Sequence, residues 1–333
     1  MTLAKKVQLS HGGGGLEMNQ FIQKLFFKRF NNEILSRDED AATLPLSANT
    51  AMTTDSFTVS PHFFAGGNIG SLAVAGTCND LAMVGAKPEY LSCSFIIEEG
   101  TDFKELEQIV DSMVEELATV DAKVVCGDTK VVPKGSADKV FINTTGVGRV
   151  LQPGISSRGI QSGDAILVSG DIGRHGACIL AARESLRLEH EMSSDCAVLW
   201  PVVDALIQQN IDIRAMRDAT RGGISAVMNE WCQSSNIQLM LQEEHIPVDD
   251  MVKGVCELFG FEPYDLANEG TFVIAVPQEF AQQTLNVLKS FNPNAALIGH
   301  AQSGEPCKPI LHTPWGSRRY LDFPLGELLP RIC

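Results

Sequence analysis

From residue 51 onward, short apolar and β-branched runs alternate with segments in which apolar residues recur at helical spacing. The clearest helical face consists of six apolar residues, Leu106, Ile109, Val110, Met113, Val114 and Leu117. Alternation of strand-like and helical segments is typical of α/β proteins. We therefore predict an α/β fold for this part of the chain.

The predicted elements form two successive series. The first comprises segments 51–59, 69–84, 90–97, 106–117, 123–126 and 140–147. The second comprises segments 165–169, 175–186, 197–209, 222–233, 271–276 and 279–290. A polar, glycine-rich connection at 153–163 lies between them and indicates a domain boundary.

Four regions follow from this pattern. Residues 1–40 contain a glycine-rich loop and a helix predicted at 18–30, and the two domains span 41–153 and 154–305. Beyond the second domain the periodicity fades into a stretch with five prolines, Pro306, Pro309, Pro314, Pro324 and Pro330. Proline-rich sequence without a period predicts an extended, mobile arm, which we place at 306–333.

The composition excludes several functions. The 333 residues are 44% hydrophobic and 20% charged, which is enough apolar material for two buried cores. A formal net charge of -15 disfavours nucleic acid and membrane surfaces as partners. Residues 1–15 lack a signal-peptide core and no run approaches the ~20 apolar residues of a membrane span, so we expect a cytoplasmic protein. Nine scattered cysteines, none in a C-x-x-C pair, are expected to be reduced thiols rather than zinc ligands.

A glycine-rich run near the start of the chain offers backbone N–H groups that no side chain obstructs. It begins at His11 and continues through Gly12, Gly13, Gly14 and Gly15. A phosphate-binding loop has this character, and so does a flexible entry into the helix that follows. Both interpretations stay open on these residues alone.

Three aspartates are predicted at the ends of strands or in the turns that follow them. They are Asp55, Asp80 and Asp128. Oxygen ligands from several loops suit Mg²⁺, which bridges to substrate phosphates. Any one of them is better explained as a turn or N-cap residue. The three together, beside a glycine-rich loop, favour a metal–nucleotide site.

Two further segments precede predicted helices and could present N-terminal amides to an anion. The first, at 66–70, includes Asn68, and the second, at 217–223, includes Asp218 and Thr220. Neither matches the P-loop, protein-kinase or dinucleotide-binding fingerprints. A nucleotide site built from them would belong to a different ATP-binding fold.

Cys333 is the last residue of the sequence. A prenylated cysteine is followed by three more residues, so prenylation is excluded. An accidental position, a metal ligand and a deliberately tethered thiol remain as explanations. A proline-rich arm would allow such a thiol to reach more than one site.

These motifs together resemble the HypE family of hydrogenase maturation factors, within the aminoimidazole-ribonucleotide synthetase (PurM)-like ATP-binding superfamily. The resemblance spans nearly the whole chain, and its most specific element is the terminal Pro330-Arg331-Ile332-Cys333. The other matching segments are the glycine-rich loop, 54–56, 66–70, 79–80, 127–132, 218–223 and 268–270. Gly13 departs from the family pattern, because serine is expected there in many relatives.

The resemblance implies an ATP-dependent carbamoyl dehydratase with a two-domain PurM-like fold, whose N-terminal domain binds ATP. A HypF-like carbamoyltransferase would place a carbamoyl group on the sulfur of Cys333, and this protein would dehydrate it to a thiocyanate. The cyano group would then pass to iron on a HypC–HypD complex, for the active site of a [NiFe] hydrogenase. The same resemblance implies a homodimer that pairs through the N-terminal sheets.

The resemblance also implies roles for individual residues. The expected ATP-binding residues are His11, Gly12, Gly13, Gly14, Asp55, Asn68, Asp80, Asp128, Thr129, Asp218 and Thr220. The expected Mg²⁺ ligands are Asp55, Asp80 and Asp128. Lys130 and Glu269 would act with Cys333 in catalysis by removing the N–H protons. For Lys130, a role as a phosphate-binding cation is equally open.

Two other functions remain open. A small-molecule kinase of the same superfamily, such as a thiamine-phosphate kinase or a selenophosphate synthetase, explains the loop and the aspartates but not the terminal Pro-Arg-Ile-Cys. A non-catalytic metal or thiol carrier would use Cys333 as a ligand. ATP hydrolysis that depends on carbamoylated Cys333 distinguishes the three.

Overall fold

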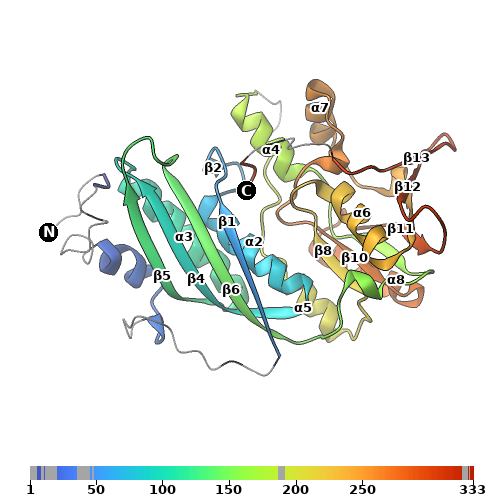
Figure 1. The fold of residues 1–333 in the computed structure, drawn as a ribbon, viewed down its shortest axis with the longest axis horizontal. Coiled ribbons are helices and arrows are strands. Elements are labelled where there is room, and N and C mark those ends of the chain that lie inside the picture. The colour runs from blue at the N-terminus through green and yellow to red at the C-terminus, as the bar shows by residue number, and fades with distance from the viewer. Residues whose placement is uncertain are drawn as a thin grey trace.

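The computed structural model describes residues 6–8, 11, 21–35, 46, 49–186, 192–324, 329 and 331–333. Figure 1 shows two α/β halves arranged along the long axis of the molecule, the N-terminal half coloured from blue to green and the C-terminal half from green to red. The first half is built on a four-stranded sheet and the second on a seven-stranded sheet. The predicted α/β fold is confirmed.

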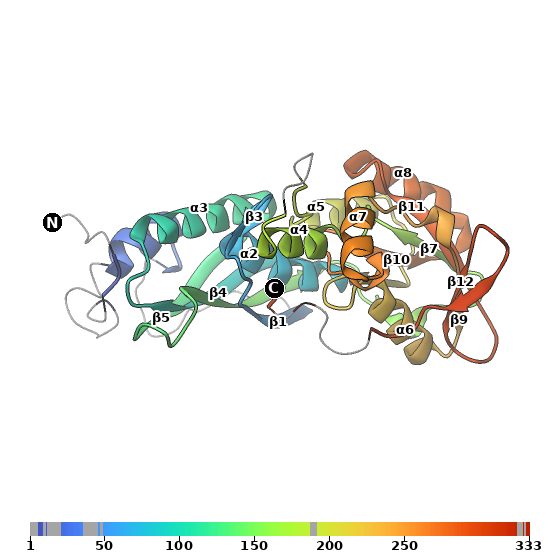
Figure 2. The same cartoon turned by 90° about the horizontal axis from the view of Figure 1, so that it is seen from above.

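The sheet of the N-terminal half has the strand order β1-β6-β4-β5. Helices α2 and α3 pack on one face of this sheet, and Figure 2 shows them on the same side. The elements of this half are η2 (Gln23–Phe27), β1 (Thr50–Phe57), β2 (Phe63–Phe64), β3 (Gly67–Asn68), α2 (Ile69–Met83), β4 (Ala86–Glu98), α3 (Phe103–Val120), β5 (Lys123–Val132) and β6 (Val140–Val150). Side chains along each strand alternate between the helix-covered face and the opposite face.

Helix α3 shows how the sequence determines this packing. The Asp102 side chain caps its N-terminus by accepting from the N–H of Lys104. The predicted apolar face is buried through Leu106, Ile109, Val110, Met113 and Leu117. Burying each such side chain contributes about 1.5–3 kcal/mol. The helix meets α2 at Gly70, where an added Cβ would collide with the carbonyl oxygen of Ile109, so glycine is required there.

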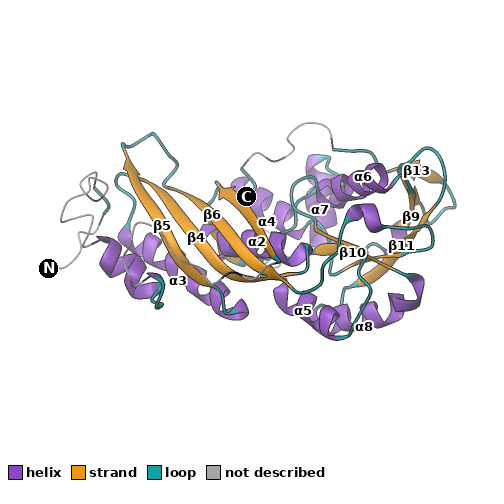
Figure 3. Ribbon diagram, turned by 60° about the horizontal axis from the view of Figure 1, so that its bottom comes forward, coloured by secondary structure: helices purple, strands orange, loops and turns teal. Residues whose placement is uncertain are grey.

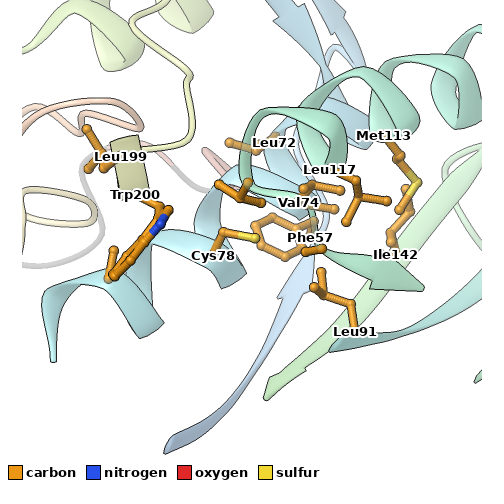
Figure 4. Close-up of a cluster of buried hydrophobic side chains, with 14 of the residues drawn as sticks. Phe57, Leu72, Val74, Cys78, Leu91, Met113, Leu117, Ile142, Leu199 and Trp200 are labelled. Carbon is orange, nitrogen blue, oxygen red and sulfur yellow. The ribbon is translucent and has the colours of Figure 1, made fainter. Parts of the chain in front are cut away.

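The two halves share a hydrophobic core. Figure 4 shows Leu199 and Trp200, which come from the C-terminal half, beside helix α2, and both belong to the same core as Phe57 of β1. Asn79 of α2 fixes the junction, because its amide donates to the carbonyl of Ala197 at 3.0 Å and accepts from the N–H of Leu199 at 2.7 Å. The two halves therefore have a fixed relative orientation, which sets the position of any site that lies between them.

The seven-stranded sheet has the order β13-β12-β9-β11-β7-β10-β8. Helices cover both faces, so the residues of β10 alternate between two cores: Phe272 and Ile274 face the shared core, while Val273 and Ala275 face a second core. Figure 3 shows α5 and α8 on one side and α6 on the other. The elements of this half are η4 (Ser157–Gly159), β7 (Ala165–Val168), α4 (Arg174–Arg183), α5 (Trp200–Gln208), β8 (Ala215–Asp218), α6 (Gly223–Ser235), β9 (Gln238–Gln242), η5 (Glu243–His245), α7 (Asp250–Phe259), η6 (Pro263–Asp265), β10 (Phe272–Val276), η7 (Gln278–Phe280), α8 (Ala281–Phe291), β11 (Ala296–Gln302), β12 (Pro309–His312) and β13 (Arg318–Tyr320).

The chain beyond residue 305 differs from the predicted arm. Strand β12 pairs in parallel with β9, and β13 pairs with β12, so both belong to the sheet. Leu311 is fully buried and Leu321 is nearly so. Pro309 is the first residue of β12, a position where a missing N–H is tolerated. A proline at the first position of β12 is therefore compatible with the strand.

The prediction that the three aspartates lie at strand ends or in the turns that follow them is also wrong. Asp55 lies within β1, Asp80 within α2 and Asp128 within β5. Around Asp128 the sequence is rich in poor strand formers, and pairing with β4 overrides that local preference. Strands β8, β9 and β11 and helix α7 were not predicted. Within the part of the chain that the structure describes, no helix combines the length and the apolar character that crossing a membrane requires.

Candidate active site

A cavity of ≈ 260 Å³ lies between the two halves, where Figure 1 shows the C-terminus. Strand β1 and helix α2 provide one wall, and the segments beside β8 and β10 provide the other. The cavity is lined by Thr54, Asp55, Phe57, Gly76, Asp80, Arg217, Asp218, Thr220, Arg221, Glu269 and Cys333. Four acidic side chains and a cysteine therefore meet in one place.

The first two acidic side chains come from the N-terminal half. Asp55 lies on the helix-covered face of β1, because its cross-strand neighbour Thr144 is fully buried on that face. Asp80 lies one helical turn after Gly76 on α2, so both residues are on the same side of the helix and line the same wall of the cavity. The hydroxyl of Thr53 donates to Oδ2 of Asp80 at 2.7 Å and holds this carboxylate in place.

The other two come from the C-terminal half. Asp218 ends β8 and pairs with Phe272 of β10. The N–H groups of Glu269 and Gly270 both donate to the carboxylate of Asp195 at 3.1 Å. A Cβ on Gly270 would collide with the carbonyl oxygen of Asp195, so glycine is required. Glu269 is 2% exposed, and its Oε1 has no hydrogen-bond partner among the described residues.

These carboxyl groups raise one another's affinity for protons. Burial, followed by the nearby Asp80 carboxylate, raises the pKa of Asp218 to about 7. Burial, followed by the carboxylate of Asp218, raises the pKa of Glu269 well above its usual range. Burial also raises the pKa of Asp55 and of Asp80. The cavity holds more negative charge than its surroundings balance, and a bound cation would relieve that excess.

The donor set suits a divalent cation. Carboxylate oxygens are preferred ligands of Mg²⁺, and Asp55, Asp80 and Asp218 all line the cavity. Among the residues that the structure describes, no three such side chains are already arranged as a metal site, so a cation would have to draw them together. Arg217 and Arg221 line the same cavity and offer positive charge to a phosphate group.

The start of helix α6 adjoins the cavity through Thr220 and Arg221. Its N-cap residue, Gly222, has a left-handed conformation, and no side chain caps the first amides. An uncapped helix N-terminus attracts anions. The structure therefore brings Asp218 and Thr220 to the same cavity as Glu269 and supports the anion-binding interpretation of 217–223.

The end of the described chain lies alongside the continuation of β1. The N–H and the hydroxyl of Thr58 donate to the main-chain oxygen of Cys333 at 2.9 and 3.2 Å. The N–H of Ser60 donates to the carbonyl of Arg331 at 3.3 Å, and Nε of Arg331 donates to the carbonyl of Thr58 at 2.9 Å. Ile332 is buried in the shared core. These contacts hold Cys333, a reduced thiol, at the cavity.

Asp128 and Lys130 do not line this cavity. They lie on β5, at the opposite edge of the four-stranded sheet from β1, about 14 Å away at the usual strand spacing. The strand register also points both side chains away from the helices, whereas Asp55 points towards them. Nζ of Lys130 donates to Asp128 at 2.8 Å, and both side chains are exposed. The sequence predicts that Asp55, Asp80 and Asp128 bind the same cation. Within one chain, however, Asp128 is too far from the other two aspartates to do so.

Thr129 and Asp128 instead line a second cavity of ≈ 290 Å³. It lies between β5 and the helical segment at 21–30, and its other walls are mostly apolar, including Phe26 and Phe27. Thr129 is buried, which reflects its place on the helix-covered face of the sheet. The two residues that the sequence assigned to ATP binding are therefore separated, in one chain, from the carboxylate cavity.

His11 and Asn68 have structural roles and do not line the carboxylate cavity. His11 is buried, and its ring packs edge-on against Phe21 and Phe103 at centroid distances of 5.8 and 5.3 Å. The Asn68 side chain caps α2 and accepts from the N–H of Gly70 at 2.7 Å. The other predicted loop residues lie outside the described residues: Gly12, Gly13, Gly14 and Gly15.

Three residues of this site were not predicted. Arg217 and Arg221 alternate with Asp218 and Thr220 in the 217–223 segment, and their charge was a signal that the sequence contained. Asp195, which orients the backbone of Glu269, belongs to no motif and lies 74 residues away in the chain. Its role emerges only from the folded structure.

Comparison with known proteins places this geometry in a class. Residues 38–150 match the N-terminal domain of AIR synthase related proteins, and residues 161–311 match the C-terminal domain of the same proteins. Fold and cavity together thus define a two-domain protein of the AIR synthase-related class.

Within that class the likeness is closer still to one group. The chain is 45% identical to carbamoyl dehydratase HypE of Escherichia coli K12, over 98% of this chain and 99% of that protein. It is 42% identical to a hydrogenase maturation protein HypE solved in complex with ATP, with a TM-score of 0.95 and 100% of both chains covered. A HypE–HypF complex contains a chain 40% identical to this one, with a TM-score of 0.80 over 93% of this chain and 100% of that chain. The chain belongs to the HypE family.

Proposed function

We propose that this protein uses ATP to dehydrate a carbamoyl group carried on the sulfur of Cys333, which gives a thiocyanate. The product supplies the cyanide ligand for the iron of a [NiFe] hydrogenase active site. The observation that supports this most directly is the position of Cys333 in the lining of a cavity with four carboxyl groups, because the residue that carries the reacting sulfur then adjoins a site for metal-bound phosphate. The full-length likeness to carbamoyl dehydratases, one of them solved with ATP, supports the same reaction.

The reaction requires a better leaving group than an amide oxygen. The carbamoyl oxygen attacks the γ-phosphate of ATP, and ADP leaves. The nitrogen then loses its protons while the C–O bond breaks, phosphate departs and the C≡N bond forms. The S–C bond persists throughout, so each turnover converts one thiocarbamate and one ATP into a thiocyanate, ADP and phosphate. Such phosphoryl transfer depends mainly on positioning and on charge neutralisation.

Glu269 is the proton acceptor that this cavity supplies. It lines the cavity together with Cys333, and its Oε1 has no hydrogen-bond partner among the described residues. Burial and the Asp218 carboxylate raise the pKa of Glu269, which makes its ionised carboxylate a stronger base than that of an exposed glutamate. Asp195 binds the N–H groups of Glu269 and Gly270, so the backbone that carries the carboxylate is fixed.

The phosphate groups would be held by both acidic and basic side chains. Asp55, Asp80 and Asp218 would hold Mg²⁺, which when bound neutralises charge on the transferred phosphoryl group. Arg217 and Arg221, together with the uncapped start of α6, would bind the remaining phosphate oxygens. This arrangement uses opposite charges side by side, and it accounts for the mixture of acidic and basic residues in one cavity.

A homodimer would complete the site. On the face of the four-stranded sheet opposite the helices, Met52 is 72% exposed and Ile96 is 43% exposed. Exposed apolar residues of this kind favour contact with another protein surface. A second copy packed there would bring its own Asp128 and Lys130 towards phosphate held near Asp55. Because Lys130 is ion-paired with Asp128, we assign it to phosphate binding rather than to proton transfer. An active monomer in sedimentation at micromolar concentration would contradict the dimer.

The reaction needs a donor and an acceptor. We propose a HypF-like carbamoyltransferase as the donor, in line with the relative that was solved as a HypE–HypF complex. We propose a HypC–HypD complex, which carries the iron, as the acceptor of the cyano group. We place the three steps in the cytoplasm.

Intact mass spectrometry tests the proposed function. After incubation with the carbamoyltransferase and its substrates, the mass should rise by one carbamoyl group, and after addition of MgATP it should fall by one water. Both changes should map to the peptide that contains Cys333. Cys307→Ala is the matched control, because Cys307 is another half-buried thiol that does not line the cavity. Modification at another cysteine, or water loss in Cys333→Ala, would show the proposal to be wrong.

A further inference from the structure

His175 is a fully buried histidine near the start of α4, and it does not line the carboxylate cavity. Its Nε2 lies 2.8 Å from the carbonyl oxygen of Ile332, and its Nδ1 lies 2.7 Å from the hydroxyl of Ser194. A carbonyl oxygen can only accept, so Nε2 carries the proton and Nδ1 accepts from Ser194. Both ring nitrogens are therefore engaged, and one tautomer is fixed.

The surroundings make this histidine a rigid donor. Burial lowers the pKa of His175, which keeps the ring neutral in the tautomer described. Ser194 is fixed in turn, because its N–H donates to the carbonyl of Ala65 at 2.8 Å and its hydroxyl accepts from the N–H of Cys196 at 3.0 Å. The Nε2–H bond therefore points at one place, the carbonyl that directly precedes Cys333.

The end of the chain is held from both halves of the protein. Thr58, in the N-terminal half, donates to the main-chain oxygen of Cys333. From α4 of the C-terminal half, Arg183 donates to the carbonyl of Arg331 at 2.5 Å, and His175 donates to the next carbonyl along. Each donor contacts main-chain oxygen, so together they set the position of the backbone from which the reacting sulfur projects.

We infer that His175 is a positioning residue for the dehydration step: its Nε2–H binds the carbonyl of Ile332 and thereby keeps the sulfur of Cys333 in the carboxylate cavity. This inference rests on the proposed function, because the reaction at Cys333 is what requires the position. To receive a carbamoyl group from another protein, the chain end must leave the cavity. The buried Nε2–H then loses its acceptor, which is unfavourable, so the histidine favours the docked state.

Replacing His175 by glutamine or by asparagine distinguishes this positioning role from simple packing. In His175→Gln the side-chain nitrogen reaches the place of Nε2, whereas in His175→Asn it reaches only the place of Nδ1. The full-length protein is treated with N-ethylmaleimide without nucleotide, and the alkylation of Cys333 is measured relative to that of Cys307. We expect the Asn variant to increase this ratio by about 2- to 12-fold, the equivalent of one hydrogen bond, and the Gln variant to keep the wild-type ratio.

Catalysis provides the second readout. The Asn variant should accept the carbamoyl group at least as fast as the wild type but lose water more slowly after MgATP is added, and the Gln variant should lose water normally. Ser194→Ala should also slow the loss of water, as His175→Asn does, because it removes the hydroxyl that orients the ring of His175. The matched control is His245→Gln, a substitution at an exposed histidine.

The outcomes are distinguishable. Equal alkylation of Cys333 in the wild type and the Asn variant would overturn the inference. So would equal impairment of the Gln and Asn variants, because a purely structural histidine predicts that result. If the wild type itself loses no water with MgATP, the proposed function fails, while the alkylation ratio still decides whether His175 holds the chain end.

Discussion

Replacement of Asp218 by asparagine should stabilise the protein without metal and nucleotide, although it removes a proposed ligand. Asp218 is buried at the end of β8, and its pKa is raised from 3.8 to about 7 by burial and by the Asp80 carboxylate. An acid whose pKa is raised on folding favours the protonated native state, so stability is lost as the pH rises. Asparagine resembles the protonated form and carries no charge at any pH.

The magnitude follows from the two pKa values. Below pH 3.8 the group is protonated in both states, and above about 7 it is charged in both, so the loss of stability develops between these limits. With about 1.4 kcal/mol for each pH unit, the native protein loses about 2 kcal/mol by pH 5.5 and about 4 kcal/mol by pH 8. The Asp218→Asn variant avoids this loss, and we expect an increase in Tm of about 5 °C at pH 8 and about half of that at pH 5.5.

Differential scanning calorimetry in EDTA at the two pH values measures this gain. Asp204→Asn on α5, which does not line the cavity, is the matched control for the substitution itself. With MgATP the order should reverse, because ligand binding stabilises the wild type and the variant lacks a metal ligand. An Asp218→Asn protein that melts at or below the wild-type temperature at pH 8, or that gains equally at both pH values, would refute the electrostatic reasoning.

Three further predictions concern the reaction. Cys333→Ala should change the free energy of unfolding by less than about 1 kcal/mol, since the thiol is half-buried, yet it should show no carbamoyl mass increase. Asp128→Asn should weaken MgATP binding at least about tenfold by calorimetry, and undiminished affinity would remove Asp128 from the site. Lys130→Ala and Glu269→Ala should accept the carbamoyl group but stall before water is lost; a Glu269→Ala protein that dehydrates at the wild-type rate would exclude this carboxylate as the proton acceptor.

The elements that the sequence predicts best are those with a strong period. Helix α3 has a continuous apolar face and appears where the pattern places it. Strands β12 and β13 were not predicted, because prolines and charged residues interrupt a pattern of only a few positions. Pairing within the sheet, which depends on residues far away in the chain, supplies what the local sequence lacks.

The site was predictable where motifs coincide with the cavity. Asp55 and Glu269 meet Cys333 as expected, but Asp128 does not, because periodicity identifies a strand without giving its place in the sheet. The contact between His175 and Ile332 spans 157 residues and has no local signature. Sequence therefore indicated which groups could do the chemistry, and folding decided which of them share a cavity in one chain.

The separation of Asp55 and Asp128 at opposite edges of one sheet has a genetic consequence. If each site combines Asp55 of one chain with Asp128 of the other, a mixed dimer of Asp55→Asn and Asp128→Asn chains contains one site with both lesions and one with neither. Two inactive alleles would then restore part of the activity when expressed together. Alleles altered at Asp55 and at Asp80 would not, because those two residues always belong to the same site.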